Sequence, residues 1–193
     1  MKVSTISAAV TEIIDPEEFA GTGVDFGIAK KTKCILVKPM QSLLTDERVM
    51  PKFLLATLEG TQMLKANSMV CVSMGADGQP LGDIWQQDEE KLHKQYDPVH
   101  VFSDGWVRFK PKPEAEREYT QIHIGYIDSE NSLPFSIRAQ WGEHQSDGTY
   151  LQHGKSGDYI LRSADSDHGV DENGQQDIWI VAKEVFEATY EVQ

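Results

Sequence analysis

The chain has 193 residues, of which 39% are hydrophobic and 25% are charged. This composition excludes collagen-like and fully disordered chains, and no apolar run approaches the roughly 20 residues of a membrane-spanning helix. Acidic residues outnumber basic residues by 31 to 18, which gives a formal net charge of −13.

The negative charge is concentrated in the last part of the chain. Residues 117–193 carry 14 acidic and 5 basic side chains. Such a segment repels a phosphate backbone, so we expect no direct binding of nucleic acid. The alternative interpretation is that this segment is an acidic decoy, which imitates nucleic acid and inhibits a nucleic-acid-binding protein.

Residues 1–31 form an N-terminal extension that matches no other part of the chain. It lacks the dense apolar stretch of a signal peptide, and a short helix is predicted to begin at Pro16. Just beyond it, Cys34 lies among apolar neighbours, as does Cys71. Free cysteine is one of the most often buried residue types, so we expect two buried thiols in a cytoplasmic protein.

Residues 32–99 are predicted to form a first unit. The pattern over 68–73 predicts a strand, followed by a turn at Ala76-Asp77-Gly78. A short helical segment is predicted over 87–96, with Asp88 as its cap. Residues 50–60 are ambiguous between helix and strand. We predict a strand because the matching segment, Leu133–Ala139, has the pattern of a strand.

Residues 100–116 are predicted to form a hairpin and a linker. Asp104-Gly105 lies between apolar and aromatic flanks, which is a hairpin signal. Pro111 and Pro113 alternate with polar residues and favour an extended linker.

Residues 117–193 are predicted to form a second unit. Its pattern predicts strands over 158–162 and 177–181, separated by a polar loop, and a short helix over 183–190. The acidic loop between the two strands lacks the spacing of a calcium-binding loop, and Gly154-Lys155-Ser156 lacks that of a phosphate-binding loop. The histidines form no zinc motif. We therefore expect no metal and no cofactor.

The two units share a set of residues at a constant offset. Asp83-Ile84-Trp85 recurs as Asp177-Ile178-Trp179, and Tyr96 and Tyr190 follow at the same spacing. Repeats of this kind point to a duplicated structural unit. We therefore predict an α+β, β-rich chain in which two small SH3-like or related bent-sheet domains with short helices pack against each other.

Part of the second unit resembles a known group of domains. Ser156-Gly157-Asp158-Tyr159-Ile160, together with the strand at Trp179 and the segment 185–191, resembles the uncharacterised small bacterial and phage domains named for a PGDYG-type motif. Ser156 stands where that motif has proline, and the first unit has no Gly-Asp-Tyr. The resemblance implies a domain type and a bacterial or phage origin, and it implies no activity.

The aromatic and polar residues of the two units provide the candidate binding site. Trp85 and Trp179 belong either to the core or to the walls of two aromatic pockets, one in each unit, with Asp83 and Asp177 as polar anchors. Trp141 and Tyr150 lie in an inserted loop, where they are candidates for exposed contacts. The remaining candidates are the polar residues of the second unit's loops, His144, His153 and Asp158.

Three functions fit these observations. The first is a non-enzymatic binding or regulatory module for a protein or a small ligand, because no catalytic motif is complete. The second is an enzyme whose site forms around His144, His153 and Asp158. The third is the acidic decoy described above. None of the three involves a membrane, and homo-oligomer formation stays open.

Overall fold

The structure is a computed structural model that describes residues 3–6, 13–14, 25–43, 49–50, 54–124, 134–165, 169–170 and 176–193. The described residues are rich in strands and include two short α-helices, which confirms the β-rich α+β class. The helix predicted from Pro16 lies outside the described residues.

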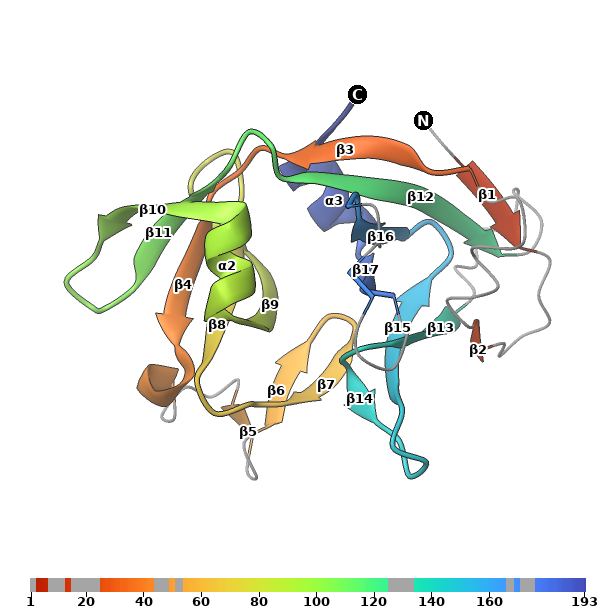
Figure 1. Ribbon diagram of the computed structural model, residues 1–193, viewed down its shortest axis with the longest axis horizontal. Coiled ribbons are helices and arrows are strands. Elements are labelled where there is room, and N and C mark those ends of the chain that lie inside the picture. Colours follow the sequence, from red (N-terminus) through yellow and green to blue (C-terminus); the bar gives the residue numbers. More distant parts are fainter. Residues whose placement is uncertain are drawn as a thin grey trace.

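The strands form two large sheets and two small ones (Figure 1). The six-stranded sheet contains β1 (Val3–Ile6), β3 (Gly27–Lys31), β12 (Glu116–Ile124), β16 (Tyr159–Ser163), β17 (Ile178–Val181) and β18 (Tyr190–Val192). The five-stranded sheet contains β4 (Ile35–Pro39), β8 (Ser68–Met74), β9 (Pro80–Asp88), β10 (Tyr96–Val101) and β11 (Val107–Pro111).

The smaller elements lie between and beside these sheets. One small sheet contains β2 (Ile13–Ile14), β13 (Pro134–Ala139), β14 (Glu143–His144) and β15 (Tyr150–Lys155). The other contains β5 (Val49–Met50), β6 (Leu54–Thr57) and β7 (Gly60–Met63), so the segment 50–60 includes strand, as predicted. The helices are η1 (Met40–Leu43), a 3-10 helix, and the α-helices α2 (Glu89–Gln95) and α3 (Lys183–Thr189).

The two large sheets have the same strand path. The five-stranded sheet runs β10-β11-β4-β8-β9, and the main path of the six-stranded sheet runs β18-β3-β12-β16-β17. Every pairing along both paths is antiparallel. In each sheet, the helix joins the strand at one end of the path to the strand at the other end, α2 from β9 to β10 and α3 from β17 to β18.

Two strand connections cross from one large sheet to the other. The chain passes from β3 in the six-stranded sheet to β4 in the five-stranded sheet, and it returns from β11 to β12. The two crossings run side by side and antiparallel, with Ile35 opposite Phe109 and Lys30 opposite Glu116 (Figure 1). The Asp104-Gly105 turn joins β10 to β11, with Gly105 at φ 86°, and this hairpin is part of the five-stranded sheet.

Each α-helix is short and buries one side. Asp88 caps α2 by accepting the backbone N–H of Lys91 at 2.6 Å, and Leu92 is fully buried. Helix α3 has no side-chain cap of its own, but the Asp158 carboxylate accepts the N–H of Lys183 at 3.0 Å. Both helices end at a tyrosine whose N–H donates to a carbonyl of the last turn, Tyr96 in α2 and Tyr190 in α3.

Two aromatic and aliphatic cores hold the helices on the sheets. Phe186 of α3 stacks on Tyr159 with ring centroids 3.8 Å apart and on Tyr190 at 4.9 Å. In the other half, Leu92 packs in a core with Ile35, Cys71 and Phe109. Cys71 is buried and Cys34 is half-buried, and both are free thiols.

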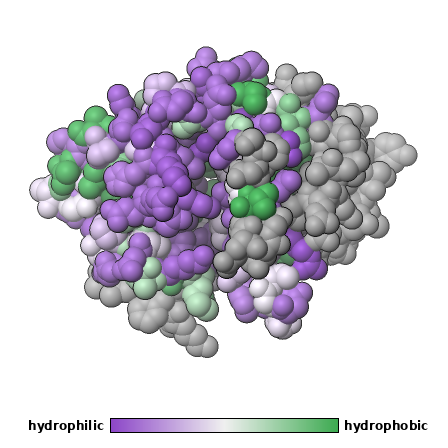
Figure 2. All heavy atoms as spheres, viewed as in Figure 1, coloured by the Kyte–Doolittle hydropathy of each residue, from purple (hydrophilic) through white to green (hydrophobic). Residues whose placement is uncertain are grey.

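The visible surface is mostly hydrophilic over the half that contains α2 (Figure 2). Hydrophobic side chains gather at the β10–β11 end, where Val99 is 55% and Val101 is 69% exposed. In the part of the chain that the structure describes, no helix is long and apolar enough to cross a membrane.

Candidate functional site

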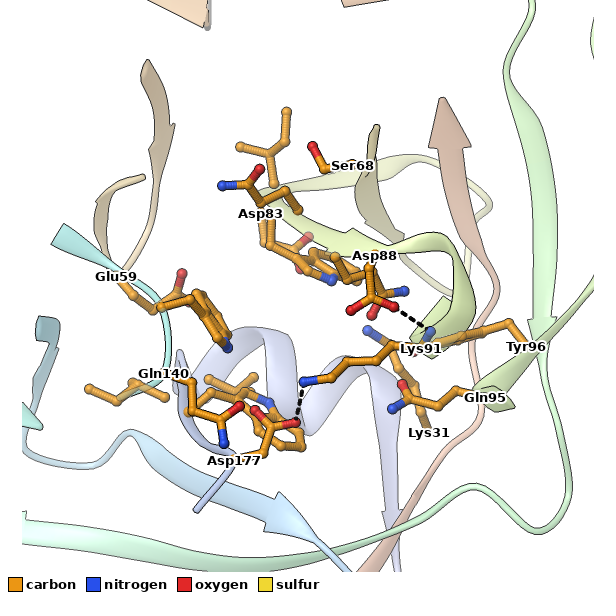
Figure 3. A pocket seen from close by; sticks show the side chains of 18 of the residues that line it. Lys31, Glu59, Ser68, Asp83, Asp88, Lys91, Gln95, Tyr96, Gln140 and Asp177 are labelled. Carbon is orange, nitrogen blue, oxygen red and sulfur yellow. Dashed lines mark hydrogen bonds and ion pairs between the residues drawn. The ribbon is translucent and has the colours of Figure 1, made fainter. Parts of the chain in front are cut away.

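A cavity of about 380 Å³ lies between the two halves of the chain, one built on the five-stranded sheet and the other on the six-stranded sheet. Its walls include three tryptophans and two tyrosines, which are Trp85, Tyr96, Trp141, Trp179 and Tyr190. Figure 3 shows that polar side chains from both halves also point into this space. A volume of this size is within the range of small-molecule sites, which is about 300–1,000 Å³.

The repeated residues reach the cavity because of their places on the strands. The last part of β9, from Asp83 to Asp88, lines the cavity along its length, and Trp85 lies within it. In the other half, Asp177 lines the cavity just before β17, and Trp179 lines it from within that strand. Trp85 lies opposite Cys71 on β8, and Trp179 lies opposite Leu161 on β16. Each tryptophan is thus on the last strand before a helix and is paired with the strand that precedes it.

Two cations from neighbouring strands line the same cavity. Lys31 is on β3 and Arg117 on β12, and Arg117 is 8% exposed. The Lys31 ammonium lies 4.6 Å from the ring centroid of Trp85 and 5.5 Å from that of Tyr190. The Arg117 guanidinium lies 5.7 Å from the ring of Trp179. Cation–π contacts of this kind stabilise a charge that has lost part of its water.

Lys31 also links the two large sheets. Its ammonium donates a hydrogen bond to Ser73 Oγ on β8 at 3.0 Å. Burial lowers the pKa of Lys31 from 10.5 to about 8, and the nearby Asp83 carboxylate opposes this shift without cancelling it. Part of the Lys31 population is therefore neutral in mildly alkaline solution.

Four carboxyl groups line the cavity. Asp177 forms an ion pair with Lys91 at 3.2 Å (Figure 3). Asp83 accepts the backbone N–H of Ser73 at 3.2 Å, and Asp88 caps α2. For the fourth, Glu59, burial raises the pKa of the carboxyl to about 7.

The two tyrosine hydroxyls remain protonated in ordinary buffers. Burial raises the pKa of Tyr190 to about 12 and that of Tyr96 well above its usual value. Both residues line the cavity. Protonated phenols can donate a hydrogen bond to a ligand oxygen.

The structure brings three of the seven predicted site residues together. Trp85, Trp141 and Trp179 line one cavity. Trp85 and Trp179 also pack against the two cores, and the cavity that they line is shared by the two units, whereas one pocket in each unit was predicted.

The other four predicted residues do not line this cavity. His144 and Tyr150 lie opposite each other on β14 and β15, with ring centroids 5.3 Å apart. Asp158 accepts backbone N–H groups from Lys155 and Lys183, so it holds a turn and the start of α3. Burial raises the pKa of the Asp158 carboxyl against these two hydrogen bonds.

His153 lies in a polar row across the small sheet. Its Nδ1 is 2.8 Å from Ser136 Oγ, and its Nε2 is 3.0 Å from Glu143 Oε2. The row spans the neighbouring strands β13, β15 and β14. Glu143 lies near His153 in the sequence, but nothing in the sequence indicated Ser136, which meets this histidine only through strand pairing.

Sequence reasoning also missed Lys31, Glu59 and Arg117. A weak signal existed for Arg117, because it stands two residues before the buried Tyr119 on the inward face of a strand. A charged residue at an inward position is unusual unless it has a partner. For Lys31 and Glu59, no local pattern distinguishes them from surface residues.

Among the described residues, no group of three or more histidine, cysteine or acidic side chains is placed to hold a metal ion. Comparisons of the chain with protein-family models, with curated proteins and with solved structures find no match.

Proposed function

We propose that this protein is a non-enzymatic binding module that takes a small, flat molecule into the cavity between its two halves. The observation that supports this most strongly is the gathering of Trp85, Trp141 and Trp179 around one space of about 380 Å³. Aromatic walls with a few polar groups are typical of small-molecule sites, because the rings supply apolar contact and the polar groups fix orientation.

The NMR chemical shifts of the tryptophan indole N–H groups test this function directly. The chain has four tryptophans, so a ¹⁵N-labelled sample gives four indole N–H signals in an NMR spectrum. Trp106 packs beside a different cluster and serves as the internal control. We expect ligands from a fragment collection to shift the signals of Trp85, Trp141 and Trp179 and to leave that of Trp106 unchanged. A collection that shifts none of the three, or shifts Trp106 equally, contradicts the proposal.

We further propose that the chain is a tandem duplication of SH3-like units that exchange a strand. Unit one is β3, β4, β8, β9, α2 and β10, and unit two is β11, β12, β16, β17, α3 and β18. Each is a series of antiparallel strands with a helix before the last. The β5–β7 hairpins and the β13–β15 strands are inserted at the same place, after the second strand of each unit.

The strand registers support the duplication. Tyr96 lies opposite Pro111 on β11, and Tyr190 lies opposite Lys31 on β3. In this arrangement β11 fills in the first half the place that β3 fills in the second. On this view the sequence boundaries, 32–99 and 117–193, each omit a unit's own first strand. The first strands lie instead in the N-terminal extension and in the linker.

An enzyme in the second unit is the alternative function, and one observation favours it. The row Ser136–His153–Glu143 has the order of a hydroxyl, a base and a carboxylate used in nucleophilic catalysis. Asp158, predicted as part of such a site, is engaged by two backbone amides instead. Labelling with a fluorophosphonate probe tests this alternative: modification of Ser136 that is lost in His153→Ala would support it, and a lack of modification would exclude a reactive serine.

The acidic decoy is the least supported of the three functions. Of the nine acidic residues described within 117–193, six have a basic partner within 4.0 Å, and these are Glu118, Glu143, Asp147, Asp177, Glu184 and Glu187. A decoy needs carboxylates that are available to a partner's lysines and arginines.

The PGDYG-type resemblance and the cytoplasmic location stay predictions. In the structure, Asp158 ends a turn and Tyr159 is the first residue of β16. The two free cysteines fit a reducing compartment.

A further inference from the structure

Lys31 and Arg117 are adjacent cations on one face of the six-stranded sheet. Arg117 lies opposite Ala29, and Lys31 is two residues beyond Ala29 on the same strand. Because alternate residues share a face, the two cationic side chains point the same way and are diagonal neighbours. The positive charge of Arg117 contributes to the lowered pKa of Lys31, which fits this proximity.

Neither cation has a carboxylate partner within 4.0 Å among the described residues. The ammonium of Lys31 donates to Ser73 Oγ, and Arg117 Nη1 donates to the carbonyl of Glu116 at 2.6 Å. A guanidinium has five N–H donors and an ammonium has three. Both groups therefore keep donors that the chain does not use, and both line the cavity.

The acidic groups of the cavity do not neutralise this pair. Asp177 is engaged by Lys91, Asp88 is at the start of α2, and Glu59 is largely protonated below pH 7. Asp83 is buried, its charge acts on Lys31, and its carboxylate accepts the N–H of Ser73. This end of the cavity therefore carries an excess of positive charge.

The hydroxyls of Tyr96 and Tyr190 add neutral donors to the same end. Both tyrosines line the cavity, and the ring of Tyr190 lies 5.5 Å from the Lys31 ammonium. No hydrogen bond joins either hydroxyl to another residue that the structure describes. Two cations and two phenol donors around one end of an aromatic cavity are a donor set suited to an oxyanion.

We propose that the ligand of this cavity is an aromatic or heteroaromatic anion whose carboxylate or phosphate group contacts Lys31 and Arg117. This inference rests on the binding function proposed above and adds the chemical class of the ligand. Burying an unpaired cation costs free energy, and an anionic ligand would offset that cost, whereas a neutral or cationic one would not. The ring of the ligand would lie among the tryptophans.

A matched series of ligands tests the charge preference. We would titrate the protein with 2-naphthoate, 2-naphthamide, 2-naphthylmethylamine and 2-naphthyl phosphate, using calorimetry together with the indole N–H signals. We expect the carboxylate or the phosphate to bind at least about tenfold more tightly than the amide, since a charge-assisted contact contributes about 1.5–3 kcal/mol. We expect the amine to bind most weakly. The ratio between carboxylate and phosphate identifies which oxyanion the site prefers.

Variants locate the effect at the two cations. Lys31→Met and Arg117→Gln should each reduce the preference for the acid over the amide, while Arg117→Lys should retain part of it. Lys30→Met is the matched control, because Lys30 is the neighbouring residue on β3 and pairs with Glu116 instead. Folding of each variant is checked by the dispersion of its NMR spectrum.

The outcomes separate this inference from the binding function. If no member of the series and no fragment shifts the three indole signals, the binding function fails. If the signals shift but the amide or the amine binds as tightly as the acid, the cavity binds ligands and the anion preference is wrong. A preference for the acid that persists in both Lys31→Met and Arg117→Gln would also overturn it.

Discussion

Lys31 Nζ on β3 donates a hydrogen bond to Ser73 Oγ on β8, 3.0 Å away, and this contact joins the two large sheets at the floor of the cavity. A lysine placed there loses much of its hydration, which is why its pKa falls to about 8. The contact therefore connects the packing of the two halves with the charge of the candidate site.

Stability should depend on the charge of Lys31. The folded-state pKa of about 8 is below the ordinary 10.5, so the unfolded chain binds more protons between these values. The free energy of unfolding should therefore rise with pH across this window. Lys31→Met should remove this slope and stabilise the protein at pH 7 by about 1–2 kcal/mol. Urea denaturation at pH 7.5, 8.5 and 9.5 measures both.

Wild type and Lys31→Met have the same residues around position 31. Asp83, Cys71 and Arg117 are the charged and titratable groups that influence it, and all three are present in both proteins. Burial raises the pKa of Cys71 to about 12 and Lys31 opposes this shift, so the slopes of the two proteins are compared below pH 9, where Cys71 is protonated. A slope that is the same in Lys31→Met and in wild type would contradict the assignment to Lys31.

Glu59 should have the opposite dependence at lower pH. Its pKa is raised from 4.5 to about 7, so its contribution to stability is full below pH 4.5 and is lost as the pH rises through 7. Glu59→Gln should match wild type at pH 5 and exceed it at pH 8 by about 1 kcal/mol, since the carboxyl keeps some contact with solvent. Thermal unfolding at the two pH values checks this. Equal stability of the two proteins at pH 8 would contradict the raised pKa of this carboxyl.

The aromatic stack on α3 should carry much of the stability of the second half. Phe186 is 2% exposed and lies between Tyr159 and Tyr190. Phe186→Ala should cost about 3–5 kcal/mol, and Phe186→Leu about 1–2 kcal/mol, because leucine leaves a smaller cavity. Because Tyr190 lines the cavity, Phe186→Ala should also weaken ligand binding. Unfolding and ligand titrations of the same samples measure the two effects, and an unfolding change below 1 kcal/mol would contradict this packing.

Asp158 should behave as a structural residue. Removal of its carboxylate in Asp158→Ala leaves the backbone N–H groups of Lys155 and Lys183 without their acceptor, at a cost of about 1–3 kcal/mol. The matched control is Asp88→Ala, which removes the cap of α2 and should cost about 1 kcal/mol. Denaturation curves compare the two. Retention of full stability in Asp158→Ala would contradict a structural role for this carboxylate.

The exchanged strands predict which fragments fold. All five strands of one large sheet lie within residues 34–112, so a fragment with these bounds contains its complete sheet. A fragment of residues 116–193 lacks β3, which lies between β12 and β18. We expect a dispersed NMR spectrum for the first fragment and a collapsed one for the second, and recovery of the second when a peptide of residues 25–33 is added. A well-dispersed spectrum of 116–193 alone would contradict this.

Several local elements could be predicted from the sequence. The residue pattern predicted β8, β16 and β17, the Asp104-Gly105 turn predicted the hairpin, and Asp88 predicted the start of α2. These features depend on residues that are close in sequence, so propensity and pattern are sufficient to find them.

The recurrence of Trp85 as Trp179 pointed to two of the aromatic residues that line the cavity, although it left open whether they are core or pocket walls. The structure gives them both roles, since each tryptophan packs on a core with one part and lines the cavity with another. The spacing of the tryptophans in the sequence does not show which part of each indole ring packs on the core and which part lines the cavity.

The tertiary structure alone decided which sheet each crossing strand joins and which charges meet in the cavity. Strand β3 pairs across about 90 residues with β12, and this pairing places Lys31 beside Arg117. Ser136, Glu143 and His153 meet in the same way, through strand register. Pairing between distant strands depends on the packing of the whole chain, and a buried lysine has the same local sequence signature as an exposed one until its neighbours are in place.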